Sequence, residues 1–392
     1  MSEKRRVAIT GLGVVSPVGI GKAAYWEGLL SPQPTEERRA HDFEPKDFYD
    51  EPKAIRRADR FEQFAVAASK EALEQAGELA ADPAKRGVLI GTGIGGVQSH
   101  EDQTLVLDQK GARRVSPFVV PMMMANAGAA AVSIRWGFQG PCESLATACA
   151  TGTHAIGAAA RWIQWGLCDA VVAGGAEAAM TPISITGFTN MKALSPSGVS
   201  RPFDVDRDGF VIAEGGAVVV LEEWSQAEGR GAEILGEVLG SASLADAHHI
   251  TAPAPEGEGA LRCMQAALDD AGLGASEIAH INAHGTSTAL NDAAEAEGIA
   301  KLFGTPGPIV TSTKGVTGHS LGAAGALEAV AVLLAMQNGV VPPTDGLANY
   351  DPALPPIDLV QQAPRPWTPG PSLSNSFGFG GHNGTLVLAP PR

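Results

Sequence analysis

Residues 147–160 read Thr-Ala-Cys-Ala-Thr-Gly-Thr-His-Ala-Ile-Gly-Ala-Ala-Ala, and residues 313–325 echo them as Thr-Lys-Gly-Val-Thr-Gly-His-Ser-Leu-Gly-Ala-Ala-Gly. Each stretch follows a predicted strand, contains Thr-Gly and opens a helix of small residues that can pack closely against a neighbour. After each predicted helix come a glycine and an apolar strand, at Gly166 and Gly339. This self-similarity indicates two duplicated halves, which we place at residues 1–230 and 231–392.

Short β-rich runs alternate with helical patterns along the rest of the chain, which is typical of an α/β fold. The clearest helix is predicted over 61–76, where apolar residues recur at helical spacing and Gly77 follows as a C-terminal cap. A second helix is predicted from about Gly259 to Ala271, before Gly272. The predicted strands are Val7–Thr10, Val88–Gly91, Ala170–Ala173, Ala217–Glu222, Ile278–Asn282, Ile309–Ser312 and Thr385–Leu388.

The composition is that of a globular protein, since 44% of the 392 residues are hydrophobic and 18% are charged. A net charge of −15 opposes nonspecific binding to nucleic acid. Glycine and proline interrupt the basic N-terminus too early for a signal peptide. The apolar stretch 322–336 contains Glu328 and is shorter than the roughly 20 residues that span a bilayer. We therefore expect a cytoplasmic protein without a membrane segment.

Two glycine clusters resemble nucleotide-binding fingerprints, at Gly11-Leu-Gly13 and at Gly91-Thr-Gly-Ile-Gly-Gly96. Pro17 closely follows the first cluster. The second is not followed by a strand ending in an acidic residue about 20 positions later, which the ribose contact requires. The glycines therefore do not indicate a nucleotide cofactor.

Cys149 is the candidate nucleophile, because it stands where a helix begins. The positive end of a helix dipole and the unpaired N–H groups there favour a thiolate, which is a nucleophile near neutral pH. The four cysteines form no CxxC pair, and an ordinary buried thiol describes Cys142, Cys168 and Cys263 well. No G-x-S-x-G motif supports a serine hydrolase instead.

Two histidines stand in contexts of their own: His284 in Asn-Ala-His-Gly-Thr-Ser-Thr after a strand, and His319 in Lys-Gly-Val-Thr-Gly-His. The ends of strands in α/β sheets are where ligands bind. A single histidine is more often structural, but two of them together with a cysteine at a helix start favour catalysis. No third and fourth metal ligands are evident, so no metal is expected. His41, His100, His154, His248, His249, His280 and His382 receive no assignment.

The last informative motif is residues 375–383, Asn-Ser-Phe-Gly-Phe-Gly-Gly-His-Asn. Its glycines permit backbone conformations that direct N–H groups toward an oxyanion. Phe377 and Phe379 have an ordinary alternative as core residues, which the surrounding glycines disfavour.

Together these motifs resemble the thiolase superfamily and, within it, the β-ketoacyl-acyl-carrier-protein synthases. The resemblance covers nearly the whole chain and includes Gly174–Glu177, Arg201–Asp204 and Arg207–Phe210. It implies a five-layered α-β-α-β-α fold with two similar halves. It also implies a homodimer, or a heterodimer with a chain-length factor, that acts on substrates carried by acyl carrier protein.

The resemblance implies decarboxylative condensation without a cofactor. Cys149 is expected to accept an acyl group, with the N–H groups of Cys149 and Phe379 holding the oxyanion. His284 and His319 are expected to stabilise the enolate formed when a malonyl unit loses its carboxylate. Attack of that enolate on acyl-Cys149 gives a β-ketoacyl product that is two carbons longer.

The resemblance also gives roles to supporting residues. Lys314 and Glu328 are expected to organise charge around His319, although a plain buried ion pair is the alternative. Contacts with the phosphopantetheine arm and the acyl chain are expected from Thr286, Thr288, Phe377, Ile94 and Val119, and Phe379 is also expected to gate acyl entry.

Two basic clusters fall where relatives dock the acidic carrier protein, although a solvated surface is the ordinary alternative for each: Lys53, Arg56 and Arg57, and Arg113 with Arg114. Three departures from the family pattern stand out. The loop 195–200 is short and lacks a basic residue, Val119 replaces a bulkier phenylalanine, and His382 replaces a threonine.

Other functions fit less well. A degradative thiolase needs a second active cysteine in its C-terminal motif, but no cysteine follows Cys263. A noncatalytic chain-length factor usually lacks the nucleophile, and Cys149 argues against that role. The sequence leaves open whether the product is a fatty acid or a polyketide or polyene chain.

Overall fold

A single mixed sheet runs through the molecule, in the order β11-β9-β8-β13-β14-β7-β1-β6-β5-β3-β4, with β2 beside β1. This is a computed structural model that describes residues 4–32 and 37–391. Two short strands, β10 and β12, pair separately. The strands are β1 Val7–Ser16, β2 Gly19–Ile20, β3 Arg86–Gly91, β4 Cys142–Glu143, β5 Ala170–Glu177, β6 Gly215–Glu223, β7 Gly236–Ala245, β8 His280–Asn282, β9 Ile309–Thr311, β10 Val340–Val341, β11 Asp358–Leu359, β12 Arg365–Pro366, β13 Ser372–Gly378 and β14 His382–Ala389.

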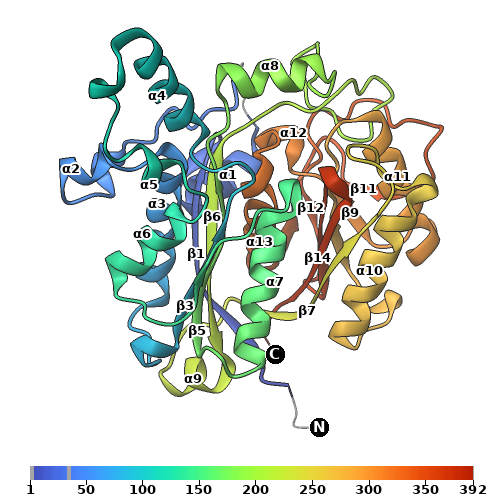
Figure 1. Ribbon diagram of the computed structural model, residues 1–392. Helices are drawn as coiled ribbons and strands as arrows, with labels where there is room; N and C mark the ends of the chain where they lie inside the picture. Colours follow the sequence, from blue (N-terminus) through green and yellow to red (C-terminus); the bar gives the residue numbers. More distant parts are fainter. Residues whose placement is uncertain (1–3, 33–36, 392) are drawn as a thin grey trace.

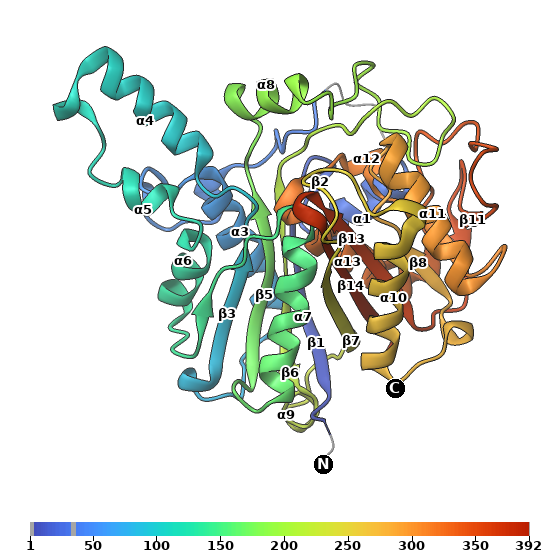
Figure 2. The ribbon, with the colours of Figure 1, turned by 45° about the vertical axis from the view of Figure 1, so that its right-hand side comes forward.

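The helices form three layers that alternate with the two halves of this sheet (Figures 1 and 2). The helices are α1 Lys22–Leu30, α2 Pro52–Ile55, α3 Arg60–Ala76, α4 Val97–Lys110, α5 Val119–Met123, α6 Ala127–Trp136, α7 Thr151–Gln164, α8 Pro182–Asn190, α9 Trp224–Gly229, α10 Glu258–Ala271, α11 Ala289–Phe303, α12 Lys314–Thr317 and α13 Ala324–Asn338. Helices α3 and α6 cover one outer face, α10 and α11 cover the other, and α7 and α13 contact strands of both halves. The predicted five-layered α/β fold is confirmed.

The two halves of the sheet have the same topology. In the first, β1-β6-β5-β3-β4 are paired antiparallel, antiparallel, parallel and parallel in turn. In the second, β7-β14-β13-β8-β9 follow the same order in the chain and the same pairing senses. Antiparallel pairing of β1 with β7 joins the halves. The central helices α7 and α13 begin within the two sequence repeats, whereas the division at residue 230 stays a prediction.

Strand β1 is longer than predicted, because Gly11 and Gly13 belong to it. Helix α3 packs so closely on this strand that a Cβ atom at Gly11 would lie 2.0 Å from the carbonyl oxygen of Ala72. At Gly13 it would lie 1.8 Å from that of Ala68. The first glycine cluster therefore serves close packing between a helix and a strand.

The other predicted elements are present with shifted ends. Helices α3 and α10 each begin one residue earlier than predicted. The apolar stretch 322–336 forms most of α13, and 89% of the window 321–338 is buried inside the molecule. Strands β7 and β13 were not predicted, because their small and polar residues do not show an apolar strand pattern.

Candidate active site

Cys149 lies in a short 3₁₀ turn, Ala148–Ala150, that leads directly into α7. Ala148 has a positive φ of 50°, a conformation that costs energy for a residue with a side chain. Thr151 supports the turn, since its hydroxyl donates to the Ala148 carbonyl at 2.7 Å and accepts from the Thr147 N–H at 2.8 Å. The chain is thus bent sharply where it presents a buried thiol.

The glycine motif after β13 lies against this turn. A Cβ atom at Gly378 would lie 3.0 Å from the Cys149 nitrogen, so only glycine fits there without displacing the turn. Gly380 and Gly381 both have positive φ, at 80° and 74°. The N–H groups of Phe379 and Cys149 form hydrogen bonds to the Cys149 sulfur that lower its pKa. The two predicted oxyanion donors therefore converge on the nucleophile.

His284 and His319 meet Cys149 from the other half of the molecule. One ligand atom from each residue, the Cys149 sulfur and a ring nitrogen of each histidine, lies within 4.8 Å of the other two. The imidazole rings are 5.3 Å apart between centroids and nearly perpendicular. His284 follows β8, and His319 follows α12. The structure thus supplies a third potential metal ligand that the sequence did not reveal.

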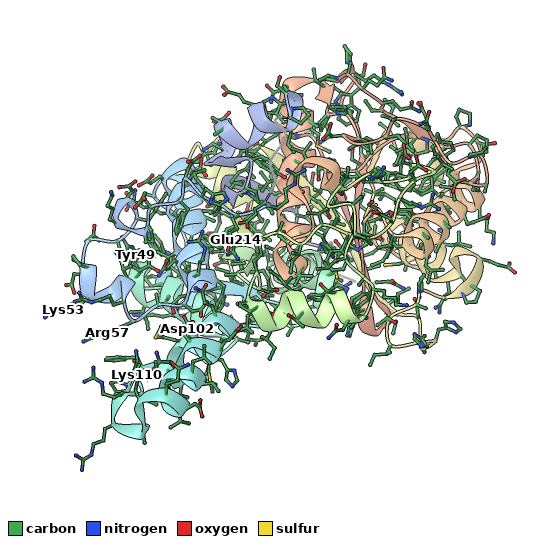
Figure 3. The ribbon with its side chains drawn as sticks, turned by 90° about the horizontal axis from the view of Figure 1, so that it is seen from above. Tyr49, Lys53, Arg57, Asp102, Lys110 and Glu214 are labelled. Atoms are coloured by element: carbon green, nitrogen blue, oxygen red, sulfur yellow. The ribbon has the colours of Figure 1, made fainter. Side chains whose placement is uncertain are left out.

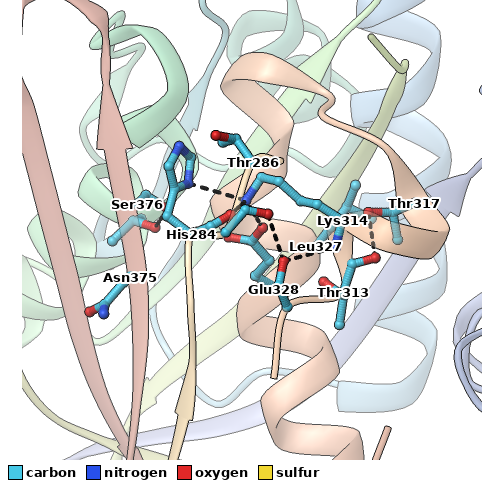
Figure 4. A network of polar contacts seen from close by, with 12 residues as sticks. His284, Thr286, Thr313, Lys314, Thr317, Leu327, Glu328, Asn375 and Ser376 are labelled. Atoms are coloured by element: carbon cyan, nitrogen blue, oxygen red, sulfur yellow. Dashed lines mark hydrogen bonds and ion pairs between the residues drawn. The ribbon is translucent and has the colours of Figure 1, made fainter. Parts of the chain in front are cut away.

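A buried ion pair supports His284 (Figure 4). The Lys314 ammonium lies 3.1 Å from Nδ1 of His284 and donates to its backbone carbonyl at 2.7 Å. The same ammonium forms an ion pair with Glu328, which is on α13. Because Lys314 donates to Nδ1, the neutral ring of His284 carries its proton on Nε2. Lys314 therefore contacts His284 directly, whereas it was predicted to organise the surroundings of His319.

Burial controls the protonation of the site. Desolvation and the nearby Lys314 charge hold the pKa values of His284 and His319 well below their usual range, so both rings are neutral. Burial also raises the pKa of Cys149 to about 11, although the Phe379 N–H and the Lys314 charge act against it. The prediction of a thiolate at neutral pH is wrong for the site without substrate. Desolvation raises the pKa of Cys149 by more than the helix N-terminus lowers it.

A cavity of about 430 Å³ opens beside these groups. Its lining includes Ile94, Thr286, Thr288, Phe377 and Phe379, together with the catalytic candidates Cys149, His284 and His319. Val119, at the start of α5, and His382, at the start of β14, are not among the lining residues. The cavity thus brings together every predicted substrate contact except Val119.

Lys192 is a lining residue that the sequence analysis missed. It is exposed and has a positive φ of 58°. The loop 195–200 lacks the basic residue that relatives often have there, and Lys192 stands three positions before that loop. An exposed cation at a cavity mouth can attract an anionic group of a substrate.

Two buried acids on α11 were also missed, although they hold the His284 loop in place. Glu295 accepts the N–H groups of His284 and Gly285, both at 2.8 Å. Asp292 accepts those of Thr286 and Ser287, at 2.9 and 3.1 Å. Their spacing of three residues on the helix after the histidine motif was the available signal, because such residues share one helix face.

Glu177, at the end of β5, holds the two halves together at the cavity. Its carboxylate accepts N–H groups from Gly93 and Ile94 at 2.7 and 3.3 Å, and from Gly322 at 3.0 Å. The loop that carries Ile94 is thereby fixed to the segment after His319. Burial raises the pKa of this carboxyl to about 7.

The predicted docking residues lie on α2, directly after α2 and just after the end of α4, and all of them are exposed. The guanidinium of Arg57 lies over the ring of Phe118, 4.3 Å from its centroid, so the two basic segments lie on adjoining surfaces. Figure 3 shows Lys53 and Arg57 at the same end of the molecule as Lys110. The exposed basic residues at this end include Lys53, Arg56, Arg57, Lys110, Arg113 and Arg114.

Two protein-family models match the chain. The model for the β-ketoacyl synthase N-terminal domain matches residues 32–227, and that for the C-terminal domain matches residues 235–348. The chain is 45% identical to 3-oxoacyl-[acyl-carrier-protein] synthase 2 of Synechocystis, over 98% of each protein.

Solved structures of ketosynthases are similar to the chain along its whole length. The ishigamide ketosynthase/chain length factor is 32% identical with a TM-score of 0.92, over 100% of both chains. A type II polyketide ketosynthase in complex with its acyl-carrier protein, AntDE:AntF, is 30% identical with a TM-score of 0.90, again over 100% of both chains.

Proposed function

The chain belongs to the β-ketoacyl synthase family, and we propose that Cys149, His284 and His319 perform its condensation reaction on substrates bound to acyl carrier protein. The observation that carries this proposal is the meeting of these three side chains, within 4.8 Å, at the wall of one cavity. The reaction extends a fatty acyl, polyketide or polyene chain by two carbons.

In the first half-reaction, Cys149 attacks the thioester of an acyl-carrier protein. The thiol is protonated at neutral pH, so its proton leaves as the new S–C bond forms and passes to the sulfur of the departing carrier thiol. The N–H groups of Cys149 and Phe379 stabilise the oxyanion. Collapse of the tetrahedral intermediate expels the carrier thiol and leaves acyl-Cys149.

In the second half-reaction, the malonyl thioester loses carbon dioxide. The hydrogen bond from Lys314 to Nδ1 leaves Nε2 of His284 as a donor to the thioester oxygen. His319 is the second donor, and both nitrogens of its neutral ring lack a partner within the described residues. The electron pair of the broken C–C bond forms an enolate that the two donors stabilise. The enolate carbon attacks acyl-Cys149, the Cys149 thiolate is expelled, and a proton taken up from solvent regenerates the thiol.

The supporting roles follow from the same geometry. Glu328 balances the charge of Lys314 in the interior, where an unpaired ammonium is costly. Thr286 and Thr288 offer hydroxyl groups to the pantetheine arm, and Ile94, Phe377 and Phe379 offer apolar contacts to the acyl chain. The first half of the molecule, placed at residues 1–230, supplies the nucleophile, and the second supplies the two histidines. No cofactor enters these steps.

We propose that the protein acts in the cytoplasm with two kinds of partner. The exposed cations Lys53, Arg56, Arg57, Arg113 and Arg114 dock acyl carrier protein, because they offer positive charge on a chain that is otherwise acidic. A second chain of this fold, identical or a chain-length factor, covers the edge strand β4 and the exposed apolar side chains on α4 to α6. Those side chains are Leu105, Leu107, Val120, Met123 and Ile134. Val119 lies within this surface, and it meets an acyl chain only in such an assembly.

Intact-protein mass spectrometry tests the proposal. The wild-type protein, incubated with a series of acyl-carrier proteins, is expected to gain the mass of each acceptable acyl group. The Cys149→Ala variant is expected to gain none. A matched Cys142→Ser variant, which removes an exposed thiol outside the cavity, is expected to load normally. Acylation of the Cys149→Ala variant at the wild-type level would refute the proposal.

A further inference from the structure

The three reacting side chains also form a set of metal ligands. A tetrahedral zinc ion with Zn–S of about 2.3 Å and Zn–N of about 2.0 Å places its ligand atoms roughly 3.5 Å apart. The sulfur of Cys149 and the ring nitrogens of His284 and His319 are already within 4.8 Å of one another. Side-chain rotations that move these ligand atoms by about 1 Å would bring all three within bonding distance of one ion. The cavity leaves a fourth position free for water.

His319 gives independent support for a ligand at this place. Its side chain is only 2% exposed, and neither ring nitrogen has a hydrogen-bond partner within the described residues. Buried imidazole groups normally form at least one hydrogen bond. Its ring also contributes to the wall of the cavity, so a ligand in the cavity can reach it. A borderline-soft cation satisfies such a nitrogen better than an apolar acyl chain does.

Lys314 acts against a metal ion. Its ammonium donates to Nδ1 of His284, which places the ring proton on Nε2, the nitrogen that must bind the metal. Metal binding at Nε2 therefore requires this proton to leave the ring. The positive charge also repels a cation, although Glu328 and Glu177 are the nearby negative groups that partly offset it. Removing the ammonium would lift both obstacles.

From this geometry we propose that Zn²⁺ and similar cations bind Cys149, His284 and His319 as an inhibitory site, and that Lys314 weakens their binding. As the ion binds, the S–H bond of Cys149 and the Nε2–H bond of His284 break, the sulfur and one nitrogen of each ring form bonds to the metal, and both protons pass to the buffer, with no change of oxidation state. The bound ion occupies the nucleophile and both enolate donors, so it blocks both half-reactions. The inference uses the residues of the proposed function, but binding can be observed without substrate.

Cobalt spectroscopy tests the proposal without relying on activity. Co²⁺ is added to a Cys142→Ser protein, which lacks the exposed thiol but keeps the cavity. We expect a thiolate-to-cobalt charge-transfer band that Zn²⁺ abolishes by competition. Cys149→Ala should lose the band, and His319→Ala should bind at least about tenfold more weakly. Lys314→Met should bind at least about tenfold more tightly.

A control variant and an alkylation assay complete the test. His100→Ala removes an exposed histidine on α4 and should leave cobalt binding unchanged. Zn²⁺ should protect Cys149 from iodoacetamide in the wild-type protein, but not in His319→Ala at the same concentration. An absent charge-transfer band, or equal affinity in the wild type and His319→Ala, would overturn the proposal. Equal affinity in Lys314→Met would overturn the role of Lys314. Failure of acyl loading by the wild type would instead refute the proposed function.

Discussion

Lys314 contacts both His284 and the buried carboxylate Glu328. Its ammonium contacts Nδ1 of His284 and pairs with Glu328, and both partners are almost completely buried. With a neutral residue there, His284 could adopt either tautomer, and Nε2 would no longer always carry the proton that it donates to the thioester oxygen. The identity of this residue therefore affects the decarboxylation step more than the acylation step.

Replacing Lys314 with Met should separate the two half-reactions. We expect decarboxylation of malonyl-carrier protein to fall by about 10²- to 10⁴-fold, the range for loss of a positioned proton donor. Acyl loading of Cys149 should fall by less than about tenfold, because the oxyanion donors are untouched. Release of carbon dioxide and intact mass measure the two steps. Equal losses in both steps would contradict this role.

Residue-level prediction from sequence worked for Cys149, His284 and His319 because each stands in a recognisable motif. It was wrong about the protonation of Cys149, because desolvation depends on neighbours from distant segments of the chain. Glu177 and Glu295 were not assigned roles for the same reason. Most of their partners are backbone N–H groups, and the sequence does not show which distant N–H group meets which carboxylate.

At the scale of elements, strand β8 carries a buried histidine, His280, with a structural effect. His280 packs against Trp367 at 5.3 Å between ring centroids, and neither of its nitrogens has a hydrogen-bond partner within the described residues. Burial lowers the pKa of His280 to about 3. The unfolded chain binds a proton there near pH 6.5, so stability from this group is present above pH 6.5 and lost as the pH falls toward 3.

A His280→Leu variant should show less acid destabilisation than the wild type. Between pH 7.5 and pH 4.5 the wild type should lose roughly 2–3 kcal/mol of unfolding free energy through this group, and the variant should not. Urea unfolding at the two pH values measures the difference. His100→Leu, the same change at an exposed position, is the control and should follow the wild type. Parallel losses in wild type and His280→Leu would contradict the assignment.

The close packing of α3 on β1 gives another prediction at this scale. Gly13→Ala should destabilise the protein by about 3 kcal/mol or more, because the added carbon overlaps the Ala68 carbonyl. Gly229→Ala, at the end of α9, adds a carbon with nothing within 4 Å and should change stability by less than about 0.5 kcal/mol. Urea midpoints compare the two. A small effect at Gly13 would show that α3 moves away easily.

Elements with regular apolar patterns could be predicted from sequence, whereas those defined by packing could not. Helix α3 was predictable because its buried residues recur at helical spacing and Gly77 ends it. Strand β13 was not, because Ser372, Ser374 and Asn375 are polar although they are fully buried. These residues form a strand because they pair with β8 and β14, which are distant in the sequence or become neighbours only in the folded sheet.

On the scale of the whole molecule, the duplicated topology places the candidate nucleophile in one half and the two candidate histidines in the other. The repeats in the sequence predicted this correspondence, and the matching strand orders agree with it. The close meeting of Cys149 with the two histidines could not be derived from the repeats alone. It depends on the central helices α7 and α13, which contact both halves of the sheet and bring the repeat segments together.

Charge is also a property of the whole molecule, and we expect it to control docking of the carrier protein. The chain carries a net charge of −15, so an acidic carrier protein should bind at the exposed cations on α2 and near α4. Lys53→Glu with Arg57→Glu should raise KM for the carrier protein at least about tenfold at low salt, with little change in kcat. The effect should shrink as salt is added. Steady-state kinetics measures both constants.

Arg262→Glu provides the matched control for docking. Arg262 is exposed on α10, which Figure 1 shows on the opposite side of the molecule from α2. Its charge reversal should leave KM for the carrier protein within about twofold of the wild-type value. If it raised KM as much as the α2 reversals do, net charge and not a local patch would control docking.

The most direct test of the central claim measures acyl loading and malonyl decarboxylation side by side in Cys149→Ala and His319→Ala. We expect Cys149→Ala to lose loading but to keep releasing carbon dioxide, because both histidine donors remain. His319→Ala should keep loading and lose decarboxylation by at least about 10²-fold. This opposite pattern is the predicted result. Loss of both activities in both variants would contradict the claim that one half supplies the nucleophile and the other supplies the two histidines.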